Sequence, residues 1–444
     1  MHFYRLNTIL AHKGNYLHSP NVLLQSLQTD TSLQYNITTN PDRFVPNATF
    51  ANSATSANGV NRGDSRELSN EDIIFDIKSR AYLNFTPSFG LNATLGARYW
   101  YNRFKDKLFQ AAGNSATQDQ HIGALFAEGE FGLFDRAFLT LGIRGNYNSI
   151  FGSNASPRAY FAYDVIDSYL VFKGGISTGY KTPALSNLVD GVANLSTQGK
   201  SHTYGNPNLK PEQSINYEAS LLSDNEYFSA SLTGFYIDFT DKIATSPIVS
   251  TSQAIGAYTC SATMGCNSYI NYDKAKSYGT EVAFSIKPIS VGYGGVSLNA
   301  AYTYNQTKVT KTLPTPRSAS TIGTRLTNIP LHNFNASLNY DTFKFGAYIR
   351  EEFKDGIYRG NPNVANSAAA VLGEFYKPIY LTHIGGYYKF KENLKLNLAI
   401  YNLLNLDFVD YQVYSNAQNQ IAYANNYNYI REGRRYYFSM QMDF

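Results

Sequence analysis

The chain has 444 residues, of which only 16% are charged and 15% are aromatic, with 37 tyrosines and 28 phenylalanines. A soluble protein of this length needs a well-charged surface, so the composition argues against several soluble domains, and the net charge of +4 gives no reason to expect nucleic acid as a partner. The balance is typical of strands that have one face in lipid and the other in water. No apolar run of about 18 residues predicts a transmembrane helix.

The N-terminal segment predicts a β-strand near Phe3–His12 rather than a signal peptide. Tyr4, Leu6 and Leu10 are apolar at alternating positions, which is the period of a strand, and no apolar core typical of a signal peptide is present. We therefore expect the chain to begin inside a fold and to be truncated at its N-terminus.

Alternation of apolar and polar residues recurs along the rest of the chain and predicts long antiparallel strands. Several of these segments approach ten residues, whereas a mean soluble strand has about five or six, and about 9–11 tilted residues cross a bilayer. The clearest expected strands are Leu91–Tyr99, Val296–Asn305, Asn333–Tyr340, Leu394–Tyr401 and Tyr436–Phe444.

The predicted connections alternate between short turns and long polar loops, which is the plan of an outer-membrane barrel. Short turns are expected near Thr86–Phe89, Leu133–Arg136, Asp164–Asp167, Ser223–Glu226, Tyr340–Thr342 and Phe390–Asn393. Long loops are expected at Thr38–Glu71, Lys181–Gln213, Asp241–Asp273, Lys308–Asn328, Asp355–Lys377 and Asn405–Arg431. Counting back from Phe444 predicts an all-β transmembrane antiparallel barrel of about 16–18 strands, with seventeen the best count. Aromatic residues at the strand ends, such as Tyr99 and Tyr302, fit a girdle at the lipid–water interface.

The two cysteines, Cys260 and Cys266, lie close together in a segment rich in small residues. A short-loop disulfide is expected if this segment faces an oxidising compartment, and free thiols are the alternative. Closing so small a ring would stabilise the loop by about 2 kcal/mol.

Two neighbouring motifs, Gly179–Leu188 and Gly205–Glu212, resemble those of the TonB-dependent outer-membrane receptors. The matching residues are Tyr180, Pro183, Asn206, Pro207, Asn208, Leu209, Lys210, Pro211 and Glu212. Lys276–Glu281, Tyr401–Leu406 and Gly433–Phe438 agree with further family elements in the same order, and the terminal Phe444 matches the family's assembly signal. Within the family, the composition is most similar to the FrpB-like iron-regulated receptors.

The resemblance implies uptake of an iron source, haem or a ferric chelate, across the outer membrane of a Gram-negative bacterium. It also implies a 22-stranded barrel, a plug domain that contacts the TonB–ExbB–ExbD system, insertion by the barrel assembly machinery, and contact with outer-membrane lipid. Residues 1–444 would then form a single barrel domain that supplies about the last seventeen strands and lacks the plug and the signal peptide. No cofactor is implied beyond the transported ligand.

His202 is the most specific candidate for binding a ligand, because haem receptors of this family carry a histidine between two such motifs, where an imidazole can ligate haem iron. Tyr204 is the second candidate, since a phenolate can also ligate haem. Both could instead be ordinary loop residues. The last long loop adds Tyr411 and Tyr414, which could stack on a planar ligand or simply pack in the loop. Arg431, beside Arg434 and Arg435, could meet an anionic chelate or lipid phosphates, or be a plain rim charge.

No nucleophile–base arrangement and no phosphate-binding glycine loop is present in the sequence, so no enzyme activity is expected. Two other functions are compatible with the strand pattern. One is a passive porin or channel formed by a complete smaller barrel, and the other is a surface adhesin that uses its long loops.

Overall fold

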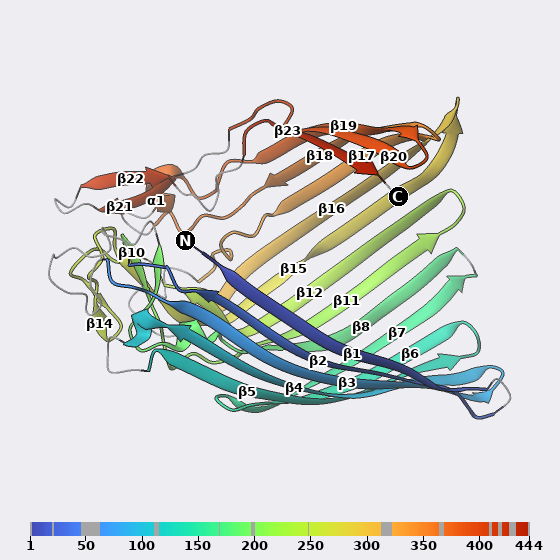
Figure 1. The fold of residues 1–444 in the computed structure, drawn as a ribbon, viewed down its shortest axis with the longest axis horizontal. Helices are drawn as coiled ribbons and strands as arrows, with labels where there is room; N and C mark the ends of the chain where they lie inside the picture. Colours follow the sequence, from blue (N-terminus) through green and yellow to red (C-terminus); the bar gives the residue numbers. More distant parts are fainter. Residues whose placement is uncertain are drawn as a thin grey trace.

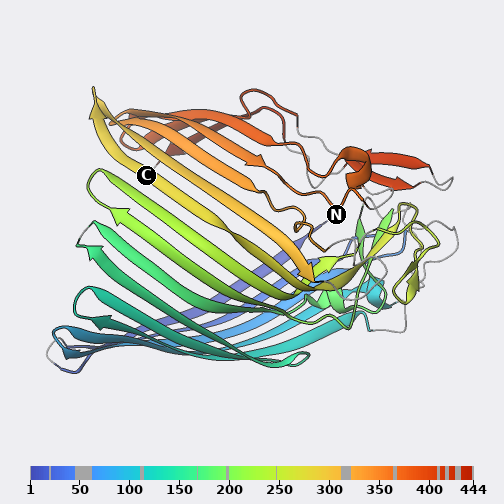
Figure 2. The same ribbon diagram turned by 180° about the vertical axis from the view of Figure 1, so that it is seen from behind.

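The computed structural model describes residues 2–19, 22–45, 63–110, 115–167, 169–196, 200–246, 248–311, 322–363, 368–407, 411–415, 420–425 and 432–442. Almost all of this structure is one curved antiparallel sheet (Figures 1 and 2). No helix in the described residues is long and apolar enough to cross a membrane.

In the described residues, seventeen strands form the wall, and each hydrogen-bonds to the next wall strand along the chain. The wall strands are β1 (Tyr4–His18), β2 (Leu24–Asn40), β3 (Leu68–Thr86), β4 (Phe89–Asp106), β5 (Thr117–Leu133), β6 (Ala137–Asn148), β7 (Gly152–Ile166), β8 (Leu170–Lys181), β11 (Glu212–Asp224), β12 (Phe228–Thr245), β15 (Cys266–Val291), β16 (Gly294–Lys311), β17 (His332–Thr342), β18 (Phe345–Asp355), β19 (Ile379–Lys391), β20 (Leu394–Tyr401) and β23 (Arg435–Met442). The predicted all-β antiparallel barrel class and its strand number are therefore confirmed. Among the described residues β1 pairs only with β2 and β23 only with β20, so these two strands are the edges of the wall.

The remaining elements are short and lie at the loop end of the wall. They are η1 (Lys107–Gln110), η2 (Leu185–Leu188), β9 (Val192–Ser196), β10 (Ser201–Tyr204), β13 (Ala254–Ile255), β14 (Tyr258–Thr259), α1 (Ala368–Leu372), β21 (Tyr411–Ser415) and β22 (Ile421–Asn425). In Figure 1 this group lies on the left, and the short turns lie on the right.

The alternation in the sequence produces a wall with two different faces. On β4, Leu95 and Tyr99 point outward and are 62% and 43% exposed, whereas Trp100 points inward and donates a hydrogen bond to Asp72 of β3 at 2.8 Å. The same alternation places Leu398 of β20 outward at 63% exposure. An outer apolar face and an inner polar face are the pattern of strands that separate lipid from water.

Short turns and long loops lie at opposite ends of the wall, as predicted, with one exception. The predicted turns at Thr86–Phe89 and Phe390–Asn393 join β3 to β4 and β19 to β20. The connection from β6 to β7 lies on the long-loop side but is short, because the buried side chain of Asn148 accepts hydrogen bonds from the backbone N–H of Ile150 and Phe151. This side chain closes the chain in a tight turn, as asparagine often does.

The expected loop Asp241–Asp273 is shorter than predicted. Both β12 and β15 continue past the wall, and Lys242 to Thr245 pair with Tyr272 to Tyr269. This paired extension carries the following loop inward over the end of the wall, where the candidate site lies.

Candidate functional site at the loop end of the wall

A small hydrophobic core holds the loop after β8 against the loop after β12. Leu108, Val192, Tyr204, Val249 and Cys266 are all buried within it, together with neighbours from the same loops. These residues come from segments that are far apart in the sequence. The described parts of the loops after β8 and β12 therefore pack with Leu108 as a compact unit, which we call the outer loop core.

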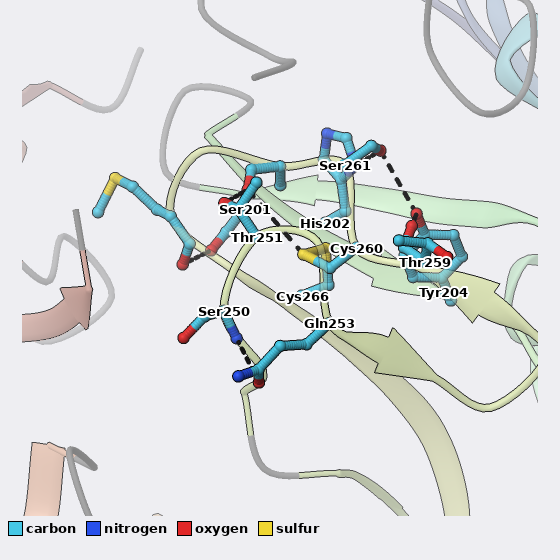
Figure 3. Close-up of a disulfide and its surroundings, with 12 residues drawn as sticks. Ser201, His202, Tyr204, Ser250, Thr251, Gln253, Thr259, Cys260, Ser261 and Cys266 are labelled. Carbon is cyan, nitrogen blue, oxygen red and sulfur yellow. Dashed lines mark hydrogen bonds between the residues drawn. A yellow bond between two sulfur atoms is a disulfide. The ribbon is translucent and has the colours of Figure 1, made fainter. Parts of the chain in front are cut away.

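A disulfide closes the centre of the outer loop core (Figure 3). Cys260 and Cys266 are joined with a Cα–Cα distance of 5.5 Å, and both are almost fully buried. The carbonyl of Cys266 accepts a hydrogen bond from the amide of Val249 at 2.7 Å, so the linked segment also pairs with its own loop.

His202 lies inside the outer loop core and only 1% of it is exposed. It occupies β10, which pairs in parallel with the start of β15 so that His202 lies opposite Cys266. Its Nδ1 lies 3.4 Å from the hydroxyl of Ser261. Ligation of haem iron by His202 stays a prediction, and it requires the outer loop core to open, because the imidazole is covered in this structure.

Tyr204 is also buried, although it lies beside His202 as the sequence suggests. Its ring stacks on that of Tyr258 at 4.7 Å between centroids, and its hydroxyl donates to the carbonyl of Thr259 at 3.1 Å. Burial raises the pKa of Tyr204, against the opposing effect of hydrogen bonds from Ser261. A raised pKa disfavours the phenolate that haem ligation would use.

The motif Asn206–Glu212 fastens the outer loop core to the wall. The side-chain amide of Asn206 donates to the carbonyl of Tyr269 at 3.1 Å, and Lys210 exchanges two hydrogen bonds with the side chain of Asn271, both at 3.0 Å. Glu212 is buried, bonds the ammonium of Lys242 at 3.1 Å and accepts from the amide of Ile243 at 2.8 Å. The motif therefore has a clear structural role, which its sequence alone did not indicate.

A cavity of about 340 Å³ lies between the outer loop core and the ends of β2, β3 and β4. Its lining includes Arg43, Arg66, Asp106, Asn194 and Tyr269. Loop residues of the outer loop core therefore close one side of it, and wall residues close the other. No local pattern in the sequence indicates this cavity, because its lining comes from separate segments spread between Phe3 and Tyr269.

Two arginines dominate the charge of the cavity. The guanidinium of Arg66 binds both carboxylate oxygens of Asp106, with its shortest contact at 2.6 Å, and both side chains are at least 96% buried. Burial, with repulsion from Arg66, lowers the pKa of Arg43, whereas Asp106 acts in the opposite direction. Asp106 already neutralises one of the two guanidinium groups, so the cavity wall has an excess of positive charge.

Of the remaining sequence candidates, Tyr411 does not line this cavity. Tyr411 begins β21, which pairs with β22, and is 44% exposed; Tyr414 lies on the same strand, but its side chain falls outside the described residues. Arg431 and Phe444 also fall outside them. Arg434 donates to the carbonyl of Leu403 at 2.9 Å. The described residues contain no group of three or more His, Cys, Asp or Glu side chains suited to hold a metal ion.

Comparison with known proteins identifies the family. The model described as TonB dependent receptor-like, beta-barrel, matches residues 3–403. This chain belongs to the TonB-dependent receptor β-barrel family. The resemblance of the two loop motifs is thereby confirmed, and the location is the outer membrane of a Gram-negative cell.

Several proteins are similar to this receptor barrel. The iron-regulated outer membrane virulence protein of Vibrio cholerae is 30% identical over 86% of this chain and 53% of its own length. The ferrienterobactin receptor of Escherichia coli is 26% identical over 73% of this chain and 42% of its own length. The chain spans about half the length of the curated relatives it matches.

Solved structures share the fold of this receptor barrel. A mutant of the ferric enterobactin receptor PfeA of Pseudomonas aeruginosa covers 100% of this chain and 62% of its own, with a TM-score of 0.70 and 18% identity. The siderophore receptor PirA of Acinetobacter baumannii gives a TM-score of 0.67 at 19% identity, with the same shares of each chain.

Proposed function

We propose that this receptor barrel takes part in the uptake of a ferric chelate across the outer membrane, working with the TonB–ExbB–ExbD system. The observation on which the proposal rests is the arginine-lined cavity under the outer loop core of a TonB-dependent barrel. Ferric chelates of the catecholate and hydroxycarboxylate classes are anionic, and guanidinium groups bind such oxygens through charge-assisted hydrogen bonds.

Two facts favour a ferric chelate over haem as the ligand. The two side chains that could ligate haem iron, His202 and Tyr204, are both buried and bonded within the outer loop core. Arg43, in contrast, lines the cavity directly. The names of the similar proteins, which include a ferrienterobactin receptor, point in the same direction.

A binding experiment on the purified chain in detergent tests this proposal. Trp100 is the single tryptophan of the chain, and it faces inward on β4 beside Asp72, which bonds the cavity residue Asn70. A bound coloured chelate should therefore quench its fluorescence. We expect saturable quenching by a ferric tris-catecholate, weakened about 10- to 100-fold in Arg43→Gln through loss of a charge-assisted bond.

The control variant is Arg136→Gln, which changes an arginine in the short turn between β5 and β6 at the opposite end of the wall. It should bind like the parent chain. Absence of saturable binding by any ferric chelate, or equal binding by Arg43→Gln and the parent, would contradict the proposal.

Haem uptake is the second candidate function, because His202 and Tyr204 are adjacent in the loop between the two motifs. It predicts saturable haem binding that His202→Ala abolishes and that reduction of the disulfide strengthens, since opening the outer loop core would uncover the imidazole. If haem binds equally well to His202→Ala and to the parent chain, His202 is not a haem ligand.

A further inference from the structure

Along the outward face of β15, apolar side chains are followed by a tyrosine and then by lysines towards the loop end of the wall. Phe284 and Val282 are apolar, Tyr278 follows nearer the loop end, and Lys276 and then Lys274 come last. The intervening Ala275 and Ser277 are 1% and 5% exposed and point inward, so the lysines point outward.

The neighbouring strand β16 repeats this order. Tyr302 and Tyr304 lie on its outward face and are followed by Lys308, while the inward Thr307 and Val309 are buried. The register places Lys308 directly opposite Lys276, and it pairs Lys274 with Lys311 across a β-bulge. Like charges directly opposite each other on one face of a sheet destabilise it. Lys274 lies two residues from Lys276 on the same face, so three lysines gather on the outward face, where a bound anion would offset their repulsion.

Lys274, Lys276 and Lys308 form what we call the lysine patch, and the chain itself neutralises its charge only in part. Within the part of the chain that the structure describes, none of Lys274, Lys276 and Lys308 forms an ion pair with a carboxylate. The ammonium of Lys276 lies over the ring of Tyr278, 5.8 Å from its centroid. Asp238 of β12 lies opposite Lys276 in the register and accepts a hydrogen bond from the hydroxyl of Tyr236 at 3.1 Å, so one carboxylate faces several lysines.

The depth of the patch in the membrane follows from the tyrosines beside it. Tyr236 and Tyr278 face each other across β12 and β15, and outward tyrosines of this kind mark the lipid–water interface. Lys276 lies two residues beyond Tyr278, which is about 7 Å along a strand. The ammonium groups of the lysine patch therefore lie at the level of lipid headgroups rather than of lipid tails or of free solvent.

We propose that Lys274, Lys276 and Lys308 bind the phosphate groups of a phosphorylated glycolipid in the outer leaflet, the headgroup of lipid A. Opposed lysines on neighbouring strands have Cβ atoms about 4.5–5.5 Å apart, which lets two ammonium groups reach one phosphate. Lysine binds phosphate as a point charge, and the apolar stretch below the patch accommodates the acyl chains. The proposal rests on the location of the protein and is independent of the ligand that it transports.

Native mass spectrometry of the purified chain in detergent tests this proposal. The probes are bis-phosphorylated lipid A, dephosphorylated lipid A and inorganic phosphate. We expect the phosphorylated lipid to bind, the dephosphorylated lipid to bind far more weakly, and inorganic phosphate at millimolar concentration not to displace the lipid. The triple variant Lys274→Gln, Lys276→Gln and Lys308→Gln should bind on the order of 100-fold more weakly, about fivefold for each lysine.

The matched control is Lys389→Gln with Lys395→Gln. These two lysines also oppose each other, on β19 and β20, but they face inward near the short turn, where both lie close to the ring of Tyr387. This variant should bind lipid A like the parent.

Three results would overturn the proposal: equal binding by the triple variant and the parent, equal binding of the dephosphorylated lipid, or full competition by inorganic phosphate. If the triple variant does not fold, as judged by heat-modified mobility in gels, the three single variants replace it, each with a fivefold loss expected. A single variant without such a loss then contradicts the assignment of its lysine.

Discussion

The ion pair between Arg66 and Asp106 offers the sharpest test of how the loop end of the wall is stabilised. The two side chains are 4% and 2% exposed and share three hydrogen bonds of 2.6–3.2 Å. Asp106 also accepts from the amide of Leu108 at 2.9 Å, which begins the turn into η1. The pair therefore joins the start of β3 to the end of β4 and to the outer loop core.

Asp106→Asn preserves the shape of the side chain and an acceptor for Leu108, but it leaves the guanidinium of Arg66 buried without its counter-charge and close to Arg43. Breaking one partner of a buried ion pair costs about 3–5 kcal/mol. The local opening free energy at the Leu108 amide should fall by this amount, so its hydrogen exchange should become at least about 100-fold faster.

A double-mutant cycle separates the pair from the two individual residues. Arg66→Met combined with Asp106→Leu replaces both charges with apolar groups, and it should cost much less than the sum of the two single changes. Amides in the turn between β19 and β20 are the internal control and should not change. Additive costs, or single variants that accelerate exchange less than threefold, would refute this account of the pair.

Three further predictions concern the outer loops. Replacing Cys260 and Cys266 by serine should lower the local stability of the outer loop core by about 2 kcal/mol, seen as faster exchange at buried loop amides, and unchanged exchange there would contradict it. Burial raises the pKa of Tyr358 to about 12, so the difference in tyrosinate absorbance between the parent and Tyr358→Phe should titrate near 12, and a midpoint near 10 would refute the assignment. The folded state keeps the phenol proton over a pH range in which the unfolded state has lost it. The contribution of Tyr358 to the stability of the folded state should therefore fall as the pH rises from about 10 to 12. Gly205→Ala would place a Cβ 2.1 Å from the carbonyl oxygen of Val189, so it should displace the loop before β9 and increase its cleavage by protease, whereas Gly234→Ala, which has open space for a Cβ, should not.

The wall of this receptor barrel was largely predictable from the sequence. A strand side chain alternates faces at every residue, so lipid on one side and water on the other impose a local pattern that can be read without any partner strand. Leu394–Tyr401 was expected as a strand and forms β20 with those bounds. The short turns were predictable for the same reason, since their residues are adjacent in the chain.

The loops were predictable only in part. Cys260 and Cys266 lie near each other in sequence, and the structure joins them. The connection between β6 and β7 is short although it lies at the end of the wall where long loops were predicted, because the side chain of a single asparagine closes the turn. The role of Asn206–Glu212 in fastening the outer loop core could not be read from its residues, because its partners at Tyr269 and Asn271 lie about sixty residues further along.

The sequence by itself determined the wall: its alternation decided the number of strands, the face of each side chain and the membrane environment, because each depends on neighbouring residues. Only the tertiary structure shows that His202 is buried, that distant segments enclose an arginine-lined cavity and that lysines of two strands form a patch. His202 is buried because β10 pairs with the start of β15. The opposed lysines become visible only when the register of β15 and β16 is known. Contacts between distant segments depend on how whole strands pair, and no local pattern in the chain specifies that pairing.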